Sequence, residues 1–205
     1  MMRNKTGQIA TVIIGAALIA FVLWMPRQPE SAAPAMTEMA SADAALSDDP
    51  VAIAVEKVSG ANPMEGILEL RALAEQEEPE VDAVVWLGVF GIQSGQLDKA
   101  RERFSEALMI EPGHVEATWQ LAMLDMEEGA YDRAVVGFEA CMDADDTYTN
   151  GLFFTARCYE AMGKTEAAVI RYQQYLPYAP DTIISARVLD FITRLESGES
   201  SGSNE

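Results

Sequence analysis

The residues in this sequence that could perform acid–base chemistry are carboxylates, which occur in adjacent pairs such as Glu127-Glu128 and Asp145-Asp146. Two carboxylates can act as general acid and general base when their surroundings separate their pKa values. Each of these pairs lies beside a predicted turn of an acidic chain, where solvated charge is the ordinary state. The one histidine, His114, follows Pro112 at a predicted helix start, so we expect an exposed turn residue there.

Nucleophilic and metal-assisted catalysis require side chains that this sequence largely lacks. The common catalytic triads and metal centres depend on histidine, and the chain contains 1 His and 2 Cys without a CxxC motif. We therefore expect no catalytic, cofactor-binding or metal-binding residues and no enzymatic activity. The cysteines, Cys141 and Cys158, fall on neighbouring predicted helices, and spacing alone leaves open whether they form a disulfide or are simply buried.

The charge balance narrows the class of partner. Among 205 residues, 14 are Lys or Arg and 33 are Asp or Glu, which gives a net charge of −19. Such a surface repels the phosphate backbone of nucleic acids and the headgroups of anionic lipids. We expect a protein partner that offers an apolar or basic segment, and no nucleic acid.

One long apolar run lies near the N-terminus. Ile9–Met25 comprises 17 residues without a charged side chain. A helix of this length reaches about 26 Å, enough to cross a slightly thinned bilayer, so we predict a single transmembrane anchor within residues 1–26. The alternative is a cleaved signal peptide, although the first A-x-A pattern, at residues 33–35, lies well beyond the run.

The flanking charges predict the orientation of this anchor. Arg3 and Lys5 precede the apolar run, whereas Arg27 alone follows it closely. The positive-inside rule then keeps the N-terminus in the cytoplasm and exports the remainder. In a bacterium this predicts a single-pass inner-membrane protein with its bulk in the periplasm, or a periplasmic protein if the run is a cleaved signal.

Two segments have the composition of unstructured chain. Residues 27–50 are rich in Ala, Pro, Ser and acid without an apolar period, which is typical of a flexible tether. Residues 197–205 predict a disordered tail by the same criterion. The folded domain is therefore expected within residues 51–196.

The folded domain repeats itself with a period of 34 residues. A glycine recurs at this spacing, followed by an alanine and then by an aromatic residue. The glycine allows a left-handed turn after a helix, the alanine lets two antiparallel helices approach, and the aromatic ring fills the space between hairpins. These columns are Gly95, Gly129 and Gly163; Ala100, Ala134 and Ala168; and Phe104, Phe138 and Tyr172.

This pattern resembles the tetratricopeptide repeat family, in which each unit is a pair of antiparallel helices. The best-matching unit, 81–114, carries the motif residues Leu87, Gly88, Gly95, Ala100, Phe104, Ala107 and Pro112. Units 115–148 and 149–182 match with departures, among them Asp146 in place of the proline and Thr155 in place of the leucine.

The resemblance implies an all-α fold, a right-handed α-solenoid of helix hairpins behind the transmembrane helix. Three repeats are clear. Residues 51–80 read as a degenerate N-terminal repeat, and the apolar stripe of residues 183–196 predicts a C-terminal capping helix.

The resemblance also implies where a partner binds, because the first helix of each repeat lines a concave groove in this family. Carried over to this chain, the groove has an apolar centre with acids at its rims, which is typical of a peptide- or helix-binding surface. Alternatively, these side chains pack on one another or on residues 51–58. The protein-binding residues expected on this basis are Val85, Val89, Ile92, Trp119, Met123, Met126, Phe153, Arg157 and Glu160.

These features predict a membrane-anchored scaffold for another envelope protein. Its architecture is similar to that of anchored repeat proteins that assist envelope assembly, cytochrome c maturation or secretion. Two alternatives stay open: a structural protein that forms homo-oligomers without a client, and an organelle-anchored adaptor that faces the cytosol, which requires the opposite orientation.

Overall fold

The computed structural model describes residues 48–198. The predictions for the anchor Ile9–Met25, for nearly all of the tether at 27–50 and for most of the tail at 197–205 lie outside the described residues. From residue 48 to residue 198, no helix is both long and apolar enough to cross a membrane.

Nine α-helices and one short 3-10 helix make up the regular structure of residues 48–198. They are α3 (Pro50–Ser59), α4 (Pro63–Ala74), α5 (Val81–Gln93), α6 (Leu97–Ile110), α7 (Val115–Glu127), α8 (Tyr131–Ala144), α9 (Asn150–Ala161), α10 (Thr165–Tyr175), the 3-10 helix η1 (Leu176–Tyr178) and α11 (Thr182–Ser197).

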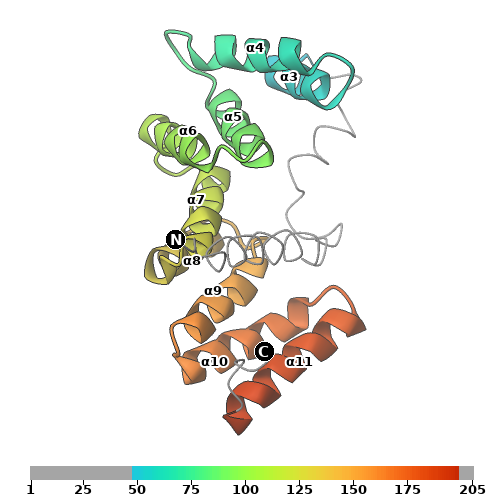
Figure 1. Cartoon of the computed structure of the whole chain (residues 1–205), viewed down its shortest axis with the longest axis vertical. Helices are drawn as coiled ribbons and strands as arrows, with labels where there is room; N and C mark the ends of the chain where they lie inside the picture. The colour runs from blue at the N-terminus through green and yellow to red at the C-terminus, as the bar shows by residue number, and fades with distance from the viewer. Residues whose placement is uncertain (1–47, 199–205) are drawn as a thin grey trace, which may run out of the picture.

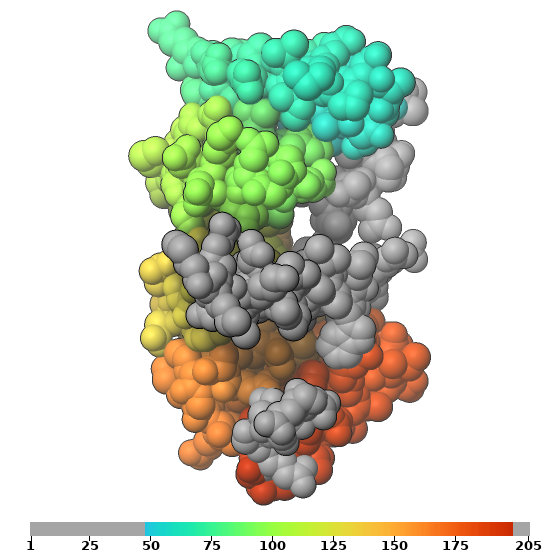
Figure 2. Space-filling view, in the orientation of Figure 1, coloured from blue at the N-terminus to red at the C-terminus, as the bar shows by residue number. Residues whose placement is uncertain are grey.

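The helices pack as four antiparallel hairpins, α3/α4, α5/α6, α7/α8 and α9/α10, and α11 packs on α10. The first helix of each later hairpin also packs on the second helix of the hairpin before it. The hairpins succeed one another along the long axis of the molecule (Figure 1), and Figure 2 shows them as successive bands on the surface. The prediction of an all-α solenoid built from helix hairpins is confirmed.

The glycine column forms the tight turn inside each of the three clear repeats. Gly95, Gly129 and Gly163 have φ angles of 73°, 77° and 71°, in the left-handed region. The Gly129 N–H donates to the Met126 carbonyl, and the next N–H donates to the Asp125 carbonyl, which are the paired bonds of a Schellman motif. Because a side chain would strain this backbone conformation, the predicted role of the glycines is confirmed.

Small residues allow the two helices of a hairpin to touch. A Cβ atom on Gly88 of α5 would lie 2.6 Å from the ring of Phe104 on α6, closer than atoms can approach. The glycine therefore makes room for the aromatic ring. The predicted alanine and aromatic columns are fully buried: Ala100, Ala134, Ala168, Phe104, Phe138 and Tyr172 are each 0% exposed.

Residues 51–80, predicted as a degenerate repeat, form the hairpin α3/α4. Asn62 lies at the N-cap of α4, although its side chain makes no capping hydrogen bond. The two helices approach most closely at Gly66, where a Cβ atom would lie 2.4 Å from the carbonyl oxygen of Ala54. At that point α4 therefore packs directly on backbone atoms of α3 as well as on the Val58 side chain.

The C-terminal end is closed by α11. α10 ends just before Pro177, which lies in η1, as expected because proline cannot continue a helix interior. Asp181 caps α11 by accepting the Ile184 N–H at 2.8 Å. Ile184, Val188 and Ile192 form the buried face of α11 in the cluster that contains Tyr172 of α10, so α11 covers the last hairpin.

Candidate protein-interaction surface

The residues predicted to line a groove lie on α5, α7 and α9, but they differ in exposure. Val85 and Trp119 are buried, at 0% and 8% exposure. The other seven are half-buried, and we call them the first-helix face. Its members are Val89, Ile92, Met123, Met126, Phe153, Arg157 and Glu160. The prediction that Val85 and Trp119 face an open groove is therefore wrong.

Trp119 is buried because aromatic side chains from three later elements enclose it. Its ring meets Phe138, Tyr148 and Phe154 edge-on, with centroids 5.0, 5.3 and 5.5 Å away. Phe138 of α8 and Phe154 of α9 also stack on each other. The Trp119 ring thus joins two successive hairpins, and for this residue the alternative of packing within the solenoid is the correct one.

The α9 part of the first-helix face is occupied by the chain itself. The ring of Phe153 lies 6.5 Å from that of Phe191 on α11. Arg157 donates to Glu160 at 3.0 Å, and its guanidinium lies 5.6 Å from the centroid of the same Phe191 ring. Glu160 also accepts the Tyr172 hydroxyl at 2.8 Å, and burial raises the pKa of that hydroxyl. These residues bind one another and leave little free for a partner.

The remaining part of the face, on α5 and α7, is apolar and partly open. Each of its side chains packs against the core on one side and keeps some exposure. Glu127 follows it at the end of α7, and burial together with the neighbouring Glu128 charge raises the Glu127 pKa. A nearby cation would stabilise the ionised form of this carboxylate, so the position favours a positively charged group of a partner. We call the four apolar residues the α5–α7 face: Val89, Ile92, Met123 and Met126.

Most cations of the domain already have carboxylate partners. Residues 48–198 contain 28 acids and 11 Lys or Arg. Eight of these cations form ion pairs: Lys57, Arg101, Arg103, Arg133, Arg157, Lys164, Arg171 and Arg194. The unpaired acids therefore set the sign of the surface potential, which favours a basic partner.

Sequence reasoning missed an ion-pair cluster that joins three helices. Asp125 of α7 is buried, and it accepts from Arg101 of α6 and from Arg133 of α8, both at 2.9 Å. Arg101 also lies 3.0 Å from Glu128. A buried carboxylate requires such partners, so the cluster fixes α6 against the following hairpin. The signal available in the sequence was an acid, Asp125, placed between the apolar residues Leu124 and Met126.

A second set of polar contacts links side chains that lie 32 residues apart, in successive repeats. His114 is one of them, and the prediction of an exposed turn residue is wrong, because its side chain is 13% exposed. Its Nδ1 accepts the Ala117 N–H at 3.3 Å and caps α7, while Nε2 lies 3.1 Å from Asp82. The four linked pairs are Asp82 with His114, Glu116 with Tyr148, Asp132 with Lys164, and Glu139 with Arg171.

The contact between Asp82 and His114 predicts a pH-dependent contribution to stability. The hydrogen bond raises the pKa of His114 and lowers the pKa of Asp82. The aspartate contribution is lost as pH falls through its lowered pKa, and the histidine contribution is lost as pH rises through its raised pKa. The pair is therefore fully stabilising between about pH 4 and pH 6.5, the two unfolded-state values.

Asp82→Asn is expected to cost about 0.5–1 kcal/mol of unfolding free energy near pH 5.5, because Asp82 is largely solvent-exposed and its ion pair is screened. The cost should be smaller near pH 8.5, where the imidazole is neutral. Urea unfolding of both proteins at the two pH values measures the difference. An equal cost at both values would contradict a charged pair.

The two cysteines and the possible metal ligands of residues 48–198 can be judged from their surroundings. Cys141 and Cys158 are free and buried, so the question of a disulfide is answered in favour of thiols. Burial raises their pKa values to about 12 and about 11, which makes them weak nucleophiles. Between residues 48 and 198, no group of three or more His, Cys, Asp or Glu side chains could hold a metal ion.

Comparison with known proteins places this geometry among helical-repeat structures. Residues 91–136 match the tetratricopeptide repeat family. Protein CTR9 homolog of Arabidopsis thaliana is 33% identical over 115 residues, which cover 50% of this chain and 10% of that relative. This chain thus spans about a tenth of the relative's length.

Solved structures of MamA share the fold. MamA from Desulfovibrio magneticus RS-1 superposes with a TM-score of 0.58 at 16% identity, covering 74% of this chain and 94% of that one. A second MamA crystal structure gives 0.57 at 14% identity, with 72% and 94% covered. The chain therefore has a MamA-like solenoid fold and carries a segment, 91–136, that is similar to tetratricopeptide repeats.

Proposed function

We propose that this protein is a scaffold that holds a segment of another envelope protein against its α5–α7 face. In this proposal Ile9–Met25 anchors the chain in the inner membrane of a bacterium, and the helical-repeat domain lies in the periplasm. The similarity to tetratricopeptide repeats and the MamA-like fold support a role in protein–protein interaction. Repeat solenoids of this kind present extended binding surfaces and act through contacts with other proteins.

The observation that carries the proposal is the partial exposure of the α5–α7 face. On α9 the chain fills the corresponding positions with its own aromatic and charged side chains, whereas on α5 and α7 apolar surface stays open. Two of the four residues are methionines, whose flexible side chains adapt to different partners.

The acid excess defines the chemistry of that partner. Glu127 stands at the end of α7, next to Met126, with a raised pKa. A basic amphipathic segment would cover the apolar side chains and place a cation near this carboxylate. A second copy of this chain would bring the same net charge of −19, so a basic client is favoured over self-association.

In-cell photo-crosslinking tests the proposal and its orientation together. A photo-reactive amino acid in place of Gln93, which is exposed next to Ile92 at the end of α5, is expected to form a discrete protein adduct. The adduct should sediment with membranes and be digested by protease added to spheroplasts. Met126→Lys should reduce the adduct about tenfold, because it replaces an apolar contact with a cation that repels a basic segment.

The matched control places the same photo-reactive amino acid at Ala186, which is exposed on α11 at the other end of the solenoid (Figure 1). No adduct is expected there. An adduct that resists external protease would reverse the orientation, and an adduct between two copies of this chain would replace the client by self-association. Identical adducts from both positions would remove the α5–α7 face from consideration.

A further inference from the structure

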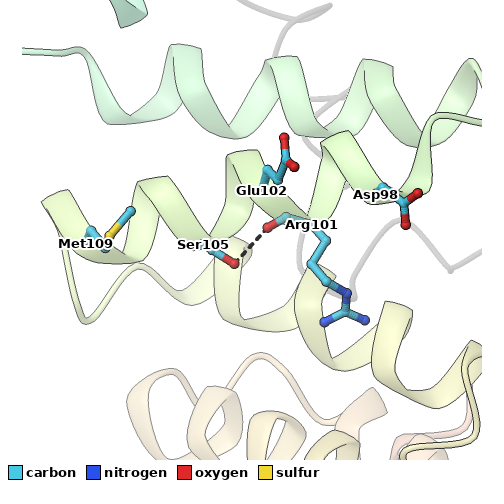
Figure 3. Close-up of a pocket in the computed structure, with 5 residues that line it drawn as sticks. All are labelled: Asp98, Arg101, Glu102, Ser105 and Met109. Carbon is cyan, nitrogen blue, oxygen red and sulfur yellow. Dashed lines mark hydrogen bonds between the residues drawn. The ribbon is translucent and has the colours of Figure 1, made fainter.

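An open cavity of about 760 Å³ runs along α6, on a different side of that helix from Phe104, which packs against α5. Its lining residues all belong to α6: Asp98, Arg101, Glu102, Ser105 and Met109. Arg101 points toward the following hairpin, where it pairs with Asp125 (Figure 3). The cavity thus shares no residue with the α5–α7 face, and one of its lining residues, Arg101, contacts the hairpin α7/α8.

In the next repeat, the acid at the position equivalent to Asp98 forms an ion pair with a lysine. Lys164, the N-cap residue of α10, donates to Asp132 of α8 at 3.2 Å. One repeat earlier, Asp98 stands in place of Asp132, and Ala130 stands in place of Lys164. Ala130 and Lys164 share the same backbone conformation, with φ and ψ of −82° and 55° against −84° and 64°. A methyl group therefore stands where the next repeat supplies a cation.

A second cation is missing for a packing reason. Arg171 of α10 donates to Glu139 of α8, and the corresponding residues one repeat earlier are Gly137 and Ser105. A Cβ atom on Gly137 would lie only 2.7 Å from the Cβ of Ala122, because α7 and α8 touch there. No long side chain can replace this glycine without separating the two helices. Neither Ala130 nor Gly137 of the hairpin α7/α8 therefore supplies a cation to α6.

The acids that line the cavity are left without cations of their own. Asp98 and Glu102 are exposed, lie four residues apart on α6, and form no ion pair within residues 48–198. Positions four apart share one face of a helix, so both carboxylates can reach one cation. One apolar side chain accompanies them in the lining: Met109 is 78% exposed.

We propose that this cavity is a second docking surface, which binds a partner segment carrying a lysine or arginine beside an apolar side chain. The cation lies between Asp98 and Glu102, as Lys164 lies on Asp132 in the next repeat, and the apolar side chain rests on Met109. Charge complementarity selects this occupant, since the net charge of −19 repels acidic segments and further copies of the chain. The scaffold can then hold two segments at once, one on each surface.

The test uses the full chain in neutral detergent micelles at low salt, with carbon-13-labelled methionine methyl groups. The probe is an alanine-based helical peptide of about 14 residues with two lysines and one leucine, and its counterpart carries glutamates instead. Met109 reports on the cavity, whereas Met123 and Met126 report on the α5–α7 face. The lysine peptide is expected to shift the Met109 resonance, and the glutamate peptide is not.

Ala130→Lys should supply the missing cation from within the chain, because its backbone matches that of Lys164. It is expected to weaken lysine-peptide binding at Met109 about fivefold or more, whereas Ala186→Lys, which makes the same charge change on α11, should have less than about a twofold effect. The double variant Asp98→Asn/Glu102→Gln should weaken lysine-peptide binding at Met109 in the same way without adding a side chain. It keeps the test valid if the Ala130→Lys protein does not fold.

Equal weakening by Ala130→Lys and Ala186→Lys, or a Met109 resonance that does not move, would overturn the cavity as a docking surface. Shifts confined to Met123 and Met126 would also overturn the cavity as a docking surface, and they would support peptide binding at the α5–α7 face. A change of oligomeric mass in Ala130→Lys would identify a second copy as the occupant and would also overturn the proposal. Shifts at Met109 with no shifts at Met123 and Met126 would support the cavity alone.

Discussion

Trp119→Ala is expected to lower the free energy of unfolding by about 3–5 kcal/mol, the usual cost of removing a large buried aromatic ring. The ring is 8% exposed and meets Phe138, Tyr148 and Phe154, which belong to three elements beyond its own helix. Its loss leaves a cavity that these rings can only partly close. Thermal and urea unfolding measure the effect, and we expect the melting temperature to fall by roughly 2–4 °C for each kcal/mol.

Tyr178→Ala provides the matched control, since it also removes an aromatic ring but from a side chain that is 54% exposed. We expect a change within about 0.5 kcal/mol for this variant. Similar unfolding free energies for the two variants would contradict the burial of Trp119. Because Trp119 is buried, a loss of partner binding in Trp119→Ala would reflect impaired folding rather than a lost contact with the partner.

Gly66→Ala is expected to destabilise the protein by about 1–3 kcal/mol, although alanine is the better helix former by about 1 kcal/mol. The added Cβ would lie 2.4 Å from the carbonyl oxygen of Ala54 and 2.7 Å from the backbone nitrogen of Val58. Backbone atoms cannot rotate away as a side-chain end can, so α3 and α4 must separate. The unfolding transition of the full chain measures the cost.

Gly113→Ala makes the same substitution at a turn where a Cβ atom would meet nothing within 4 Å. We expect it to be neutral or stabilising by up to about 1 kcal/mol, because alanine restricts the unfolded chain more than glycine does. If Gly66→Ala proved equally harmless, the close approach of α3 and α4 would be wrong. The equivalent positions in the later repeats hold Ala100, Ala134 and Ala168, so this prediction distinguishes the first hairpin from the others.

The helices and their pairing could be predicted because the evidence for them is local and repeated. A left-handed glycine such as Gly129 ends one helix whatever surrounds it, and its recurrence every 34 residues identifies the hairpin. The burial of Ala134 and Phe138 followed from the same alignment, since equivalent positions in stacked hairpins meet equivalent neighbours. Even the weak first repeat gave a hairpin, because Gly66 and Leu70 kept the spacing.

Exposure on the first-helix face could not be predicted in the same way. Trp119 and Met123 both belong to the positions that the repeat pattern assigns to a groove, yet the ring is buried and the methionine is half-buried. The difference arises because Tyr148, in the loop between α8 and α9, and Phe154 of α9 both reach the Trp119 ring. The repeat pattern specifies the direction of a side chain from its own helix but not the size of the neighbours that it meets.

The sequence alone thus determined the helical class, the hairpin unit and the acidic character that limits the partners. The tertiary structure decided which contacts join one hairpin to the next: the link from Asp82 to His114, the pairing of Asp125 with two arginines, and the unfilled cavity beside Asp98. Helix formation and reversal depend on neighbours within a few residues, which a linear sequence displays directly. Burial and ion pairing depend on distances between side chains some 8 to 32 residues apart, and those distances are set only when the hairpins stack.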